Sequence, residues 1–312
     1  MTRSFSVLLA LALTWACGIA HAADAKASCP PEPVPPTAAQ VAQWAPTAPD
    51  RGMLWRISRD GRSSYLFGSL HVGKRNWVVP GPALRAAWEA TDVLAIELDP
   101  ADVVPALAAL PPPQPLPAPL VARVDARLKA ACLPAGALAR FPAMLQVSTL
   151  MLFEFRREGL DAGFGQEMLL MAMAKAQQRP VKSLETVQEQ LEALSGGEHE
   201  LALVESALGQ LERGEVRAPG RRLADVWERG DLAALTDYES WCHCADTPAE
   251  RAWTQRINDD RNLLLAARID ALHASGQRAL VAVGALHMSG PQALPKLLAA
   301  RGFDVQALVP AK

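Results

Sequence analysis

The sequence predicts an α/β fold of partly α+β character, in which a mixed central β-sheet is flanked by helices. Two features of the 312-residue chain support this prediction. Strand-like apolar runs bounded by Gly and Pro gather near both ends, whereas helical periodicity fills the middle. A sheet built from the N- and C-terminal segments, with a large central helical block packed across it, is the simplest fold with this pattern.

The first element is a predicted secretory signal peptide over residues 1–22. Arg3 gives a positive start, residues 7–16 form an apolar run, and residues 20–22 (AHA) offer a small-x-small cleavage site. The apolar run is too short to remain as a comfortable membrane anchor. We therefore expect an exported protein, periplasmic or extracellular, with no stable membrane span after cleavage.

Composition divides the rest of the chain into two parts. Residues 23–50 are rich in Pro and Ala without apolar periodicity, which predicts a tether, and residues 51–312 are expected to form a single domain. Charges of both signs are scattered, and the formal net charge of −2 provides no basic surface. We therefore expect no nucleic-acid partner.

The domain is expected to open with a β-hairpin. Residues 54–58 alternate in polarity, Asp60-Gly61 supplies a turn, and residues 64–67 form the return strand. Later strands and helices follow from the period of the apolar residues, with a Pro-rich surface excursion between the first and second helices. The expected strands are 93–96, 181–184, 279–283 and 304–308; the expected helices are 81–90, 141–158, 166–178, 186–194, 200–211, 249–274 and 292–300; the excursion is 110–120.

Export gives the cysteines a structural meaning. Removal of the signal peptide leaves Cys29, Cys132, Cys242 and Cys244, an even set that favours disulfides in an oxidising compartment. Cysteines separated by one residue rarely bridge each other, so Cys242 and Cys244 are expected to form separate disulfides with Cys29 and Cys132, in either pairing. A metal site at Cys242-His243-Cys244 is disfavoured, because no second pair of ligands has matching spacing.

A short motif occurs twice, near opposite ends of the domain. YLFGSLHVG contains His71 and VAVGALHMSG contains His287, and in both an apolar strand runs into Gly-x-Leu-His. Glycine lets a strand turn sharply, which would place both imidazoles at the carboxyl edge of the sheet. Two imidazoles from different loops can share a metal ion, and Glu97, at the end of the strand in VLAIELD, is the expected carboxylate ligand. The alternative is that each histidine is simply packed or solvated.

Further candidate residues lie on the late helix and after the strand VKSL. Helical spacing places Asn258, Arg261 and Asn262 on one face, with Arg261 able to hold a carboxylate or oxyanion and the two asparagines expected to bind substrate. The alternative is a solvated helix face. Glu185 is a candidate general base, or else a carboxylate favoured by the dipole at a helix N-terminus.

Five segments resemble the TraB/PrgY/GumN family, which includes the TIKI-type secreted proteases. They are YLFGSLHVG, AIELD, VKSLETVQEQLEAL, DDRN and VAVGALHMSGPQALPKLLAARGFDV, and the resemblance runs from about residue 54 to 309. It implies a fold similar to that of the erythromycin-esterase and ChaN-like group. It also implies a divalent-metal site for peptide-bond hydrolysis, with His71, His287 and Glu97 as its residues. The family's Glu-Arg-Asn pattern is Asp-Arg-Asn here, at residues 260–262.

These features predict an exported, divalent-metal-dependent hydrolase that acts on a peptide or protein. An ion of manganese, cobalt or zinc at His71, His287 and Glu97 would supply a water nucleophile. Arg261 would stabilise the oxyanion and Glu185 would act as general base. The sequence has no HExxH motif, which excludes an ordinary zincin.

Three alternatives are open at this point. A His–Glu pair can act as general base without a metal, as in an esterase-like hydrolase. An exported protein with histidines at strand ends can bind haem or a metal and catalyse nothing. A surface interaction protein, in which the two motifs are only structural, is the third.

Overall fold

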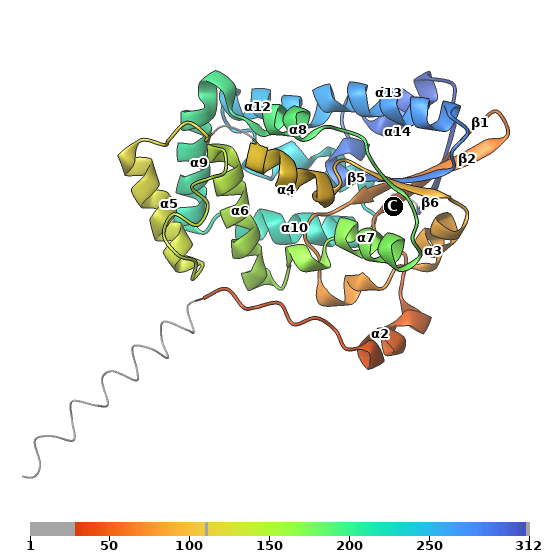
Figure 1. Cartoon of the computed structure of the whole chain (residues 1–312), viewed down its shortest axis with the longest axis horizontal. Coiled ribbons are helices and arrows are strands. Elements are labelled where there is room, and N and C mark those ends of the chain that lie inside the picture. The colour runs from red at the N-terminus through yellow and green to blue at the C-terminus, as the bar shows by residue number, and fades with distance from the viewer. Residues whose placement is uncertain (1–28, 110–111, 310–312) are drawn as a thin grey trace, which may run out of the picture.

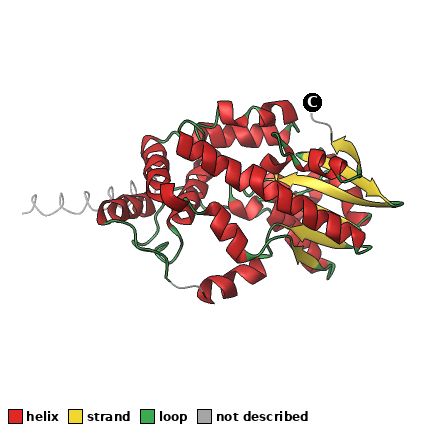
Figure 2. Cartoon of the chain, turned by 90° about the horizontal axis from the view of Figure 1, so that it is seen from above, coloured by secondary structure: helices red, strands yellow, loops and turns green. Residues whose placement is uncertain are grey.

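The computed structural model describes residues 29–109 and 112–309, so the predicted signal peptide (residues 1–22) lies outside the described residues. A six-stranded mixed sheet forms one end of the molecule, and helices flank it and build a block at the other end (Figures 1 and 2). The predicted α/β fold is thus confirmed. In the described part of the chain, no helix has the length and apolar character needed to cross a bilayer.

The sheet joins both ends of the domain, with strand order β4-β3-β5-β2-β1-β6. β1 is antiparallel to both β2 and β6, whereas the pairs β2–β5, β5–β3 and β3–β4 are parallel. Among the strands of the described residues, only β4 comes from the helical middle of the chain. The strands are β1 (Met53–Arg59), β2 (Arg62–Ser69), β3 (Val93–Ile96), β4 (Val181–Ser183), β5 (Ala279–Gly284) and β6 (Asp304–Val309).

The predicted hairpin is confirmed, and its turn shows why Asp60-Gly61 stands there. Both residues have left-handed backbones, with φ of 53° and 71°, as a two-residue type I′ turn requires. The central strands β3 and β5 are apolar along most of their length instead of alternating, because helices cover both faces of a parallel sheet.

Helices supply the remaining regular structure and two apolar cores. One core surrounds the sheet and contains Leu94 and Leu280; the second lies inside the helical block and contains Leu128 and Val204. Phe155 packs against both. The helices are α2 (Ala38–Trp44), α3 (Pro82–Glu89), α4 (Pro100–Ala109), α5 (Ala118–Ala130), α6 (Ala143–Phe155), α7 (Gln166–Ala176), α8 (Val187–Leu194), α9 (Glu200–Arg213), α10 (Arg217–Glu228), α11 (Leu232–Thr236), α12 (Pro248–Gln255), α13 (Arg261–Ala274) and α14 (Leu294–Ala300).

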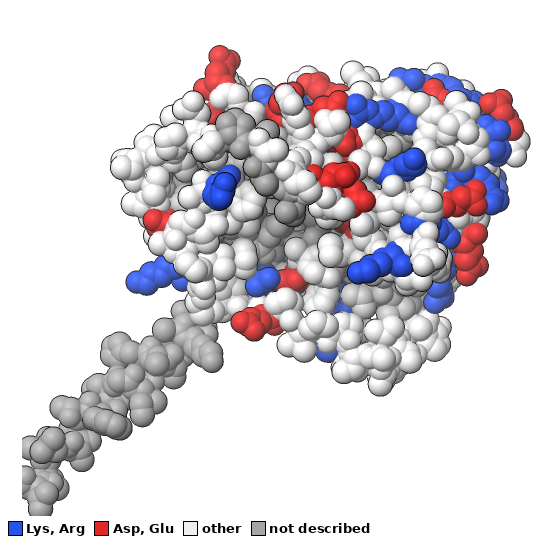
Figure 3. Space-filling view, viewed as in Figure 1, with Lys and Arg blue, Asp and Glu red and all other residues white. Residues whose placement is uncertain are grey.

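The molecular face in Figure 3 carries charges of both signs, interspersed over the sheet end and sparser over the helical block. No broad basic patch is visible on this face. This distribution agrees with the scattered charges of the sequence and its small net charge.

The described part of the expected tether is not wholly irregular, since α2 lies within it. Thr37 and Gln40 form a reciprocal capping box at its start. Arg75, in a 3₁₀ turn, donates hydrogen bonds to Gln40 Oε1 at 2.7 Å and to the Pro35 carbonyl at 3.0 Å. The helix has no buried residue, so capping and these contacts hold it instead of an apolar face. Apolar periodicity could not have revealed it.

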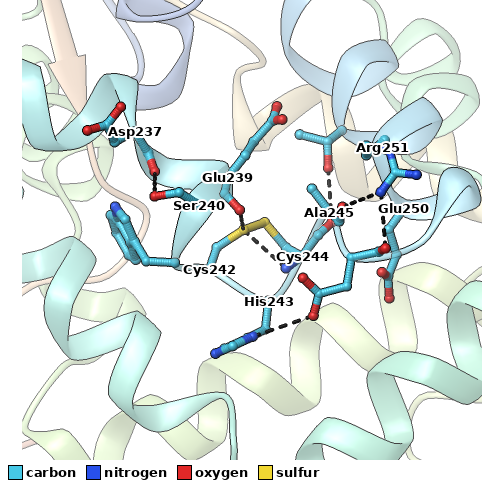
Figure 4. The surroundings of a disulfide bond; sticks show 12 residues. Asp237, Glu239, Ser240, Cys242, His243, Cys244, Ala245, Glu250 and Arg251 are labelled. Carbon is cyan, nitrogen blue, oxygen red and sulfur yellow. Dashed lines mark hydrogen bonds and ion pairs between the residues drawn. A yellow bond between two sulfur atoms is a disulfide. The ribbon is translucent and has the colours of Figure 1, made fainter.

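The predicted disulfide arrangement is wrong. Cys29 bonds to Cys132, with a Cα–Cα distance of 5.7 Å. Cys242 bonds to Cys244 (Figure 4), with a Cα–Cα distance of 5.1 Å. An extended chain would separate residues i and i+2 by about 6.6–7 Å. The intervening His243 adopts a left-handed backbone with φ of 57°, which brings the two cysteines together. Its imidazole pairs with Asp246 at 3.4 Å.

The two disulfides should contribute unequally to stability. Cys29 and Cys132 are 103 residues apart, whereas Cys242 and Cys244 are two apart. A cross-link that closes a longer loop restricts the unfolded chain more, and about 2–4 kcal/mol is typical. We expect Cys29→Ser/Cys132→Ser to lower the free energy of unfolding by about this amount. Cys242→Ser/Cys244→Ser should lower it clearly less. Denaturant titration measures both, and equal losses, or free thiols in the oxidised protein lacking residues 1–22, would contradict this.

Candidate active site at the carboxyl ends of the parallel strands

Three adjacent parallel strands bring the sequence-predicted residues to one edge of the sheet. β5 lies between β2 and β3, and Ser69 at the end of β2 pairs with Gly284 at the end of β5. His71 follows β2, His287 lies in the 3₁₀ turn after β5, and Glu97 comes directly after β3. The two Gly-x-Leu-His motifs are therefore neighbours, as expected from the topology. We call His71, Glu97 and His287 the strand-end cluster.

Gly284 is the point around which the cluster gathers. A Cβ atom placed on it would lie 3.3 Å from Glu97 Oε1, 3.6 Å from His287 Cδ2 and 4.0 Å from His71 Nε2. Its backbone N–H donates a hydrogen bond to Glu97 Oε1 at 2.7 Å. A side chain at position 284 would therefore touch all three members of the cluster, and glycine avoids this contact.

A buried arginine holds the carboxylate of the cluster. Arg261 Nη2 donates to Glu97 Oε2 at 2.7 Å, and its Nε donates to Glu185 Oε1 at 2.9 Å. The side chains of Arg261, Glu97 and Glu185 are only 12%, 10% and 1% exposed. Burial alone would raise the pKa of Glu97, but the imidazoles, the Arg261 guanidinium and the Gly284 N–H together hold this pKa below its usual range. Glu97 is therefore an oriented, ionised carboxylate.

Glu185 is enclosed, and its carboxylate binds Arg261 through both oxygens. Its backbone N–H also donates to the Glu97 carbonyl at 2.9 Å, which ties the chain after β4 to the chain after β3. A general base needs to reach a water or a substrate proton. The structure gives Glu185 the role of positioning Arg261 instead.

The imidazole of His287 is buried and has a defined tautomer. Asn262 Nδ2 donates to the carbonyls of His287 and Gln292 at 3.2 and 2.9 Å, so Asn262 Oδ1 is left as the acceptor for His287 Nδ1 at 2.7 Å. The proton is thus on Nδ1, and Nε2 presents a lone pair 3.7 Å from Glu97 Oε1. Burial lowers the pKa of His287 to about 4, so the ring is neutral at pH 7.

His71 has the opposite surroundings. Its side chain is 65% exposed, and its Nδ1 lies 3.2 Å from Oε1 of Glu167, in the first turn of α7. Ser69 Oγ donates to the same carboxylate oxygen. The negative charge of Glu167 raises the pKa of His71 to about 9, which favours the imidazolium at neutral pH. The cluster therefore combines one neutral and one protonated histidine.

Sequence reasoning missed Glu167. An acidic residue in the first turn of a helix is ordinarily explained by the helix dipole, so it gives no signal of a partner. The contact depends on tertiary packing around the His71 loop: Gln166 N–H donates to the Leu70 carbonyl at 2.9 Å, and a Cβ on Gly165 would lie 2.5 Å from the His71 carbonyl oxygen. Only a glycine lets the two segments approach this closely.

Asn258, Arg261 and Asn262 were expected to lie on one face of an α-helix, but the chain is not α-helical throughout this segment. A π-helical turn, Arg256–Asp260, interrupts the predicted long helix between α12 and α13 and changes its angular spacing. Asn262 is completely buried and orients His287, so it is not placed to bind substrate. Asn258 is partly exposed and lines a cavity beside the cluster.

The donor types of the cluster suit manganese, cobalt or zinc, but their arrangement does not fit a metal ion. Across residues 29–109 and 112–309, no three His, Cys, Asp or Glu side chains are grouped so as to hold one. Arg261 already pairs with Glu97, which weakens this carboxylate as a ligand for a metal ion. The divalent metal expected from the sequence remains a prediction.

Comparison with known families identifies the class of protein. The chain matches the TraB/PrgY/gumN family over residues 53–307 and belongs to that family. The resemblance carried by the repeated motif and the late helix is thus confirmed. No curated protein and no solved structure matched the chain.

Replacement of Arg261 should be strongly destabilising. In Arg261→Met, two buried carboxylates lose their cation, and breaking a buried pair in this way typically costs about 3–5 kcal/mol. Without the guanidinium, burial raises the pKa of Glu97 in the folded variant, so the stability of the variant falls as the pH rises through that pKa. We expect a larger deficit against the unsubstituted protein at pH 8 than at pH 5, measured by denaturant titration.

The control is Arg278→Met, which breaks the ion pair between Arg278 and Asp92. These two side chains are 52% and 57% exposed. An exposed pair contributes about 0–1 kcal/mol. If the two variants lose similar stability, or if the Arg261→Met deficit does not change with pH, the description of the buried pair is incorrect.

Proposed function

We propose that this protein is a hydrolase in which the strand-end cluster activates a water molecule for attack on a carbonyl group. One observation carries the proposal: two acceptors, His287 Nε2 and Glu97 Oε1, lie 3.7 Å apart next to Gly284, which has no side chain to separate them from His71. A single water molecule can donate a hydrogen bond to each acceptor. That water would be oriented by two groups that are themselves fixed by Asn262 and Arg261.

The reaction follows from the different states of the two histidines. As the water oxygen bonds to the carbonyl carbon, one proton passes to His287 Nε2, and the adjacent Glu97 carboxylate stabilises the imidazolium that forms. The bond to the leaving group then breaks, and the His71 imidazolium donates a proton to that group. Pairs of groups whose surroundings push their pKa values apart are typical of acid–base catalysis.

A peptide or protein is the substrate that we propose. An amide nitrogen is a poor leaving group unless it is protonated, and His71 supplies a proton that Glu167 helps it to retain. An activated ester needs no such proton. Activity on amides should therefore depend on His71 more than activity on activated esters does.

We further propose that the protein is exported to the periplasm or beyond the cell. The disulfides Cys29–Cys132 and Cys242–Cys244 support this, because such bonds persist in oxidising compartments. The predicted signal peptide over residues 1–22 agrees with it.

A metal-dependent hydrolase is the second candidate. The observation in its favour is the Asn262–His287 bond, since a histidine that binds a metal usually donates its other ring N–H to a fixed acceptor. The present donor arrangement does not fit an ion, so no step is assigned to one. Treatment with a chelator separates the two candidates.

The test is hydrolysis of a quenched fluorogenic peptide library and of p-nitrophenyl acetate by the protein lacking residues 1–22. We expect His71→Ala and His287→Ala to lower peptide hydrolysis by about 10²–10⁴-fold, the usual contribution of a general acid or base. His199→Ala is the matched control, because its half-exposed ring pairs with Glu198 away from the cluster.

Activity that survives EDTA supports the acid–base mechanism, and activity that is lost with EDTA and restored by manganese, cobalt or zinc supports the metal-dependent candidate. If the protein hydrolyses neither substrate with or without these metals, the proposed function is wrong. Bound haem or metal in such an inactive protein would favour a binding protein.

A further inference from the structure

A cavity of about 330 Å³ lies beside the strand-end cluster. Its walls come from α6, α9, α10, α12 and the π-helical turn, and from the two histidine motifs themselves. We infer that this cavity binds an uncharged apolar group of the substrate and so selects which acyl or peptide substrate is cleaved. The inference rests on the proposed function, to which it adds the substrate class.

The position of the cavity ties it to the cluster. Leu70 and Val72, on either side of His71, both line it, and so does Leu286, which precedes His287. On the other wall, Ile257 lines the cavity, and its carbonyl accepts a hydrogen bond from Arg261 Nη1 at 3.1 Å. A group seated in the cavity therefore lies beside the segments that carry His71, His287 and Arg261, although these three residues do not themselves line it.

The chemistry of the walls selects an uncharged occupant. Most of the described residues that line the cavity are apolar. The lining contains no Lys, Arg or His among the described residues. One carboxylate, Glu250, is present, but it accepts hydrogen bonds from Ser206 Oγ at 2.6 Å and from the Thr247 N–H at 2.9 Å. Desolvating a charged ligand group in this cavity would be costly. An anionic group would find no positive side chain in the lining, and a cationic group would find only Glu250, which already accepts two hydrogen bonds.

The volume sets the size of the occupant. At about 30 Å³ for each non-hydrogen atom, 330 Å³ holds about ten such atoms. This is the size of an eight- to ten-carbon acyl chain or of a large aromatic side chain. Met144 and Met151, two flexible and polarizable side chains in the wall, suit an occupant of either shape.

The first experiment measures binding without hydrolysis. Isothermal titration calorimetry with 1-octanol and with indole, an aliphatic and an aromatic probe of similar size, determines the Kd of each. Ala207 lines the cavity from α9, and Ala207→Phe fills part of it, so we expect at least a tenfold weaker Kd. Leu201→Phe, on the same helix but 51% exposed, is the matched control and should bind as the unsubstituted protein does.

The second experiment measures selectivity. The ratio of kcat/KM for p-nitrophenyl octanoate to that for the acetate should fall at least tenfold in Ala207→Phe. Met151→Ala enlarges the cavity and should shift the preferred chain length upward. If circular dichroism shows that Ala207→Phe does not fold, Met151→Ala still tests the inference.

The outcomes separate the two proposals. If the protein binds either probe, Ala207→Phe weakens this binding and no substrate is hydrolysed, the binding pocket is supported and the hydrolase is contradicted. Hydrolysis without binding of either probe and without a dependence on chain length overturns the pocket and leaves the hydrolase intact. Stronger binding of indole than of octanol identifies an aromatic occupant, and the reverse identifies an acyl chain.

Discussion

The bidentate contact of Arg261 with Glu185, together with its bond to Glu97, is the interaction on which the site depends. All three charges are buried, and buried ions are tolerated only when they are paired and hydrogen-bonded. The contact joins the start of α13 to the chain that follows β3 and β4. It fixes the orientation of the Glu97 carboxylate, whose other oxygen then faces His287 and accepts the Gly284 N–H.

The repeated Gly-x-Leu-His motif has a structural reason in the parallel pairing of β2 and β5. The two neighbouring strands end at the same level, and the chain after each strand brings an imidazole to Gly284. The turns themselves differ, since His287 lies in a 3₁₀ turn and His71 in a bend. The partners of the two imidazoles differ as well. Burial keeps His287 neutral and Asn262 sets its tautomer, whereas the charge of Glu167 favours a proton on His71. One motif thus supplies two opposite chemical roles because tertiary contacts, not the motif, set each protonation state.

The sequence predicts those features that depend on local pattern. Strand alternation and the Asp60-Gly61 turn predicted the hairpin, and the position of the apolar strands predicted that the two motifs meet. Features that depend on long-range packing or on unusual backbone were missed: Glu167 as the partner of His71, the π-helical turn before Arg261, and the Cys242–Cys244 bond that the left-handed His243 permits. The capped helix α2, which buries no side chain, left no apolar pattern to detect.

The proposed chemistry requires that one site holds two histidines in opposite protonation states. Long-range ¹H–¹⁵N correlation spectra of the folded protein test it most directly, with the His71 and His287 signals assigned from the His71→Ala and His287→Ala variants. We expect His71 to keep its proton to about pH 9 and His287 to lose its proton near pH 4, with the neutral His287 ring protonated on Nδ1. If both rings titrate together near the unperturbed pKa of about 6.5, the two histidines do not differ in protonation state and the proposed acid–base pair does not exist.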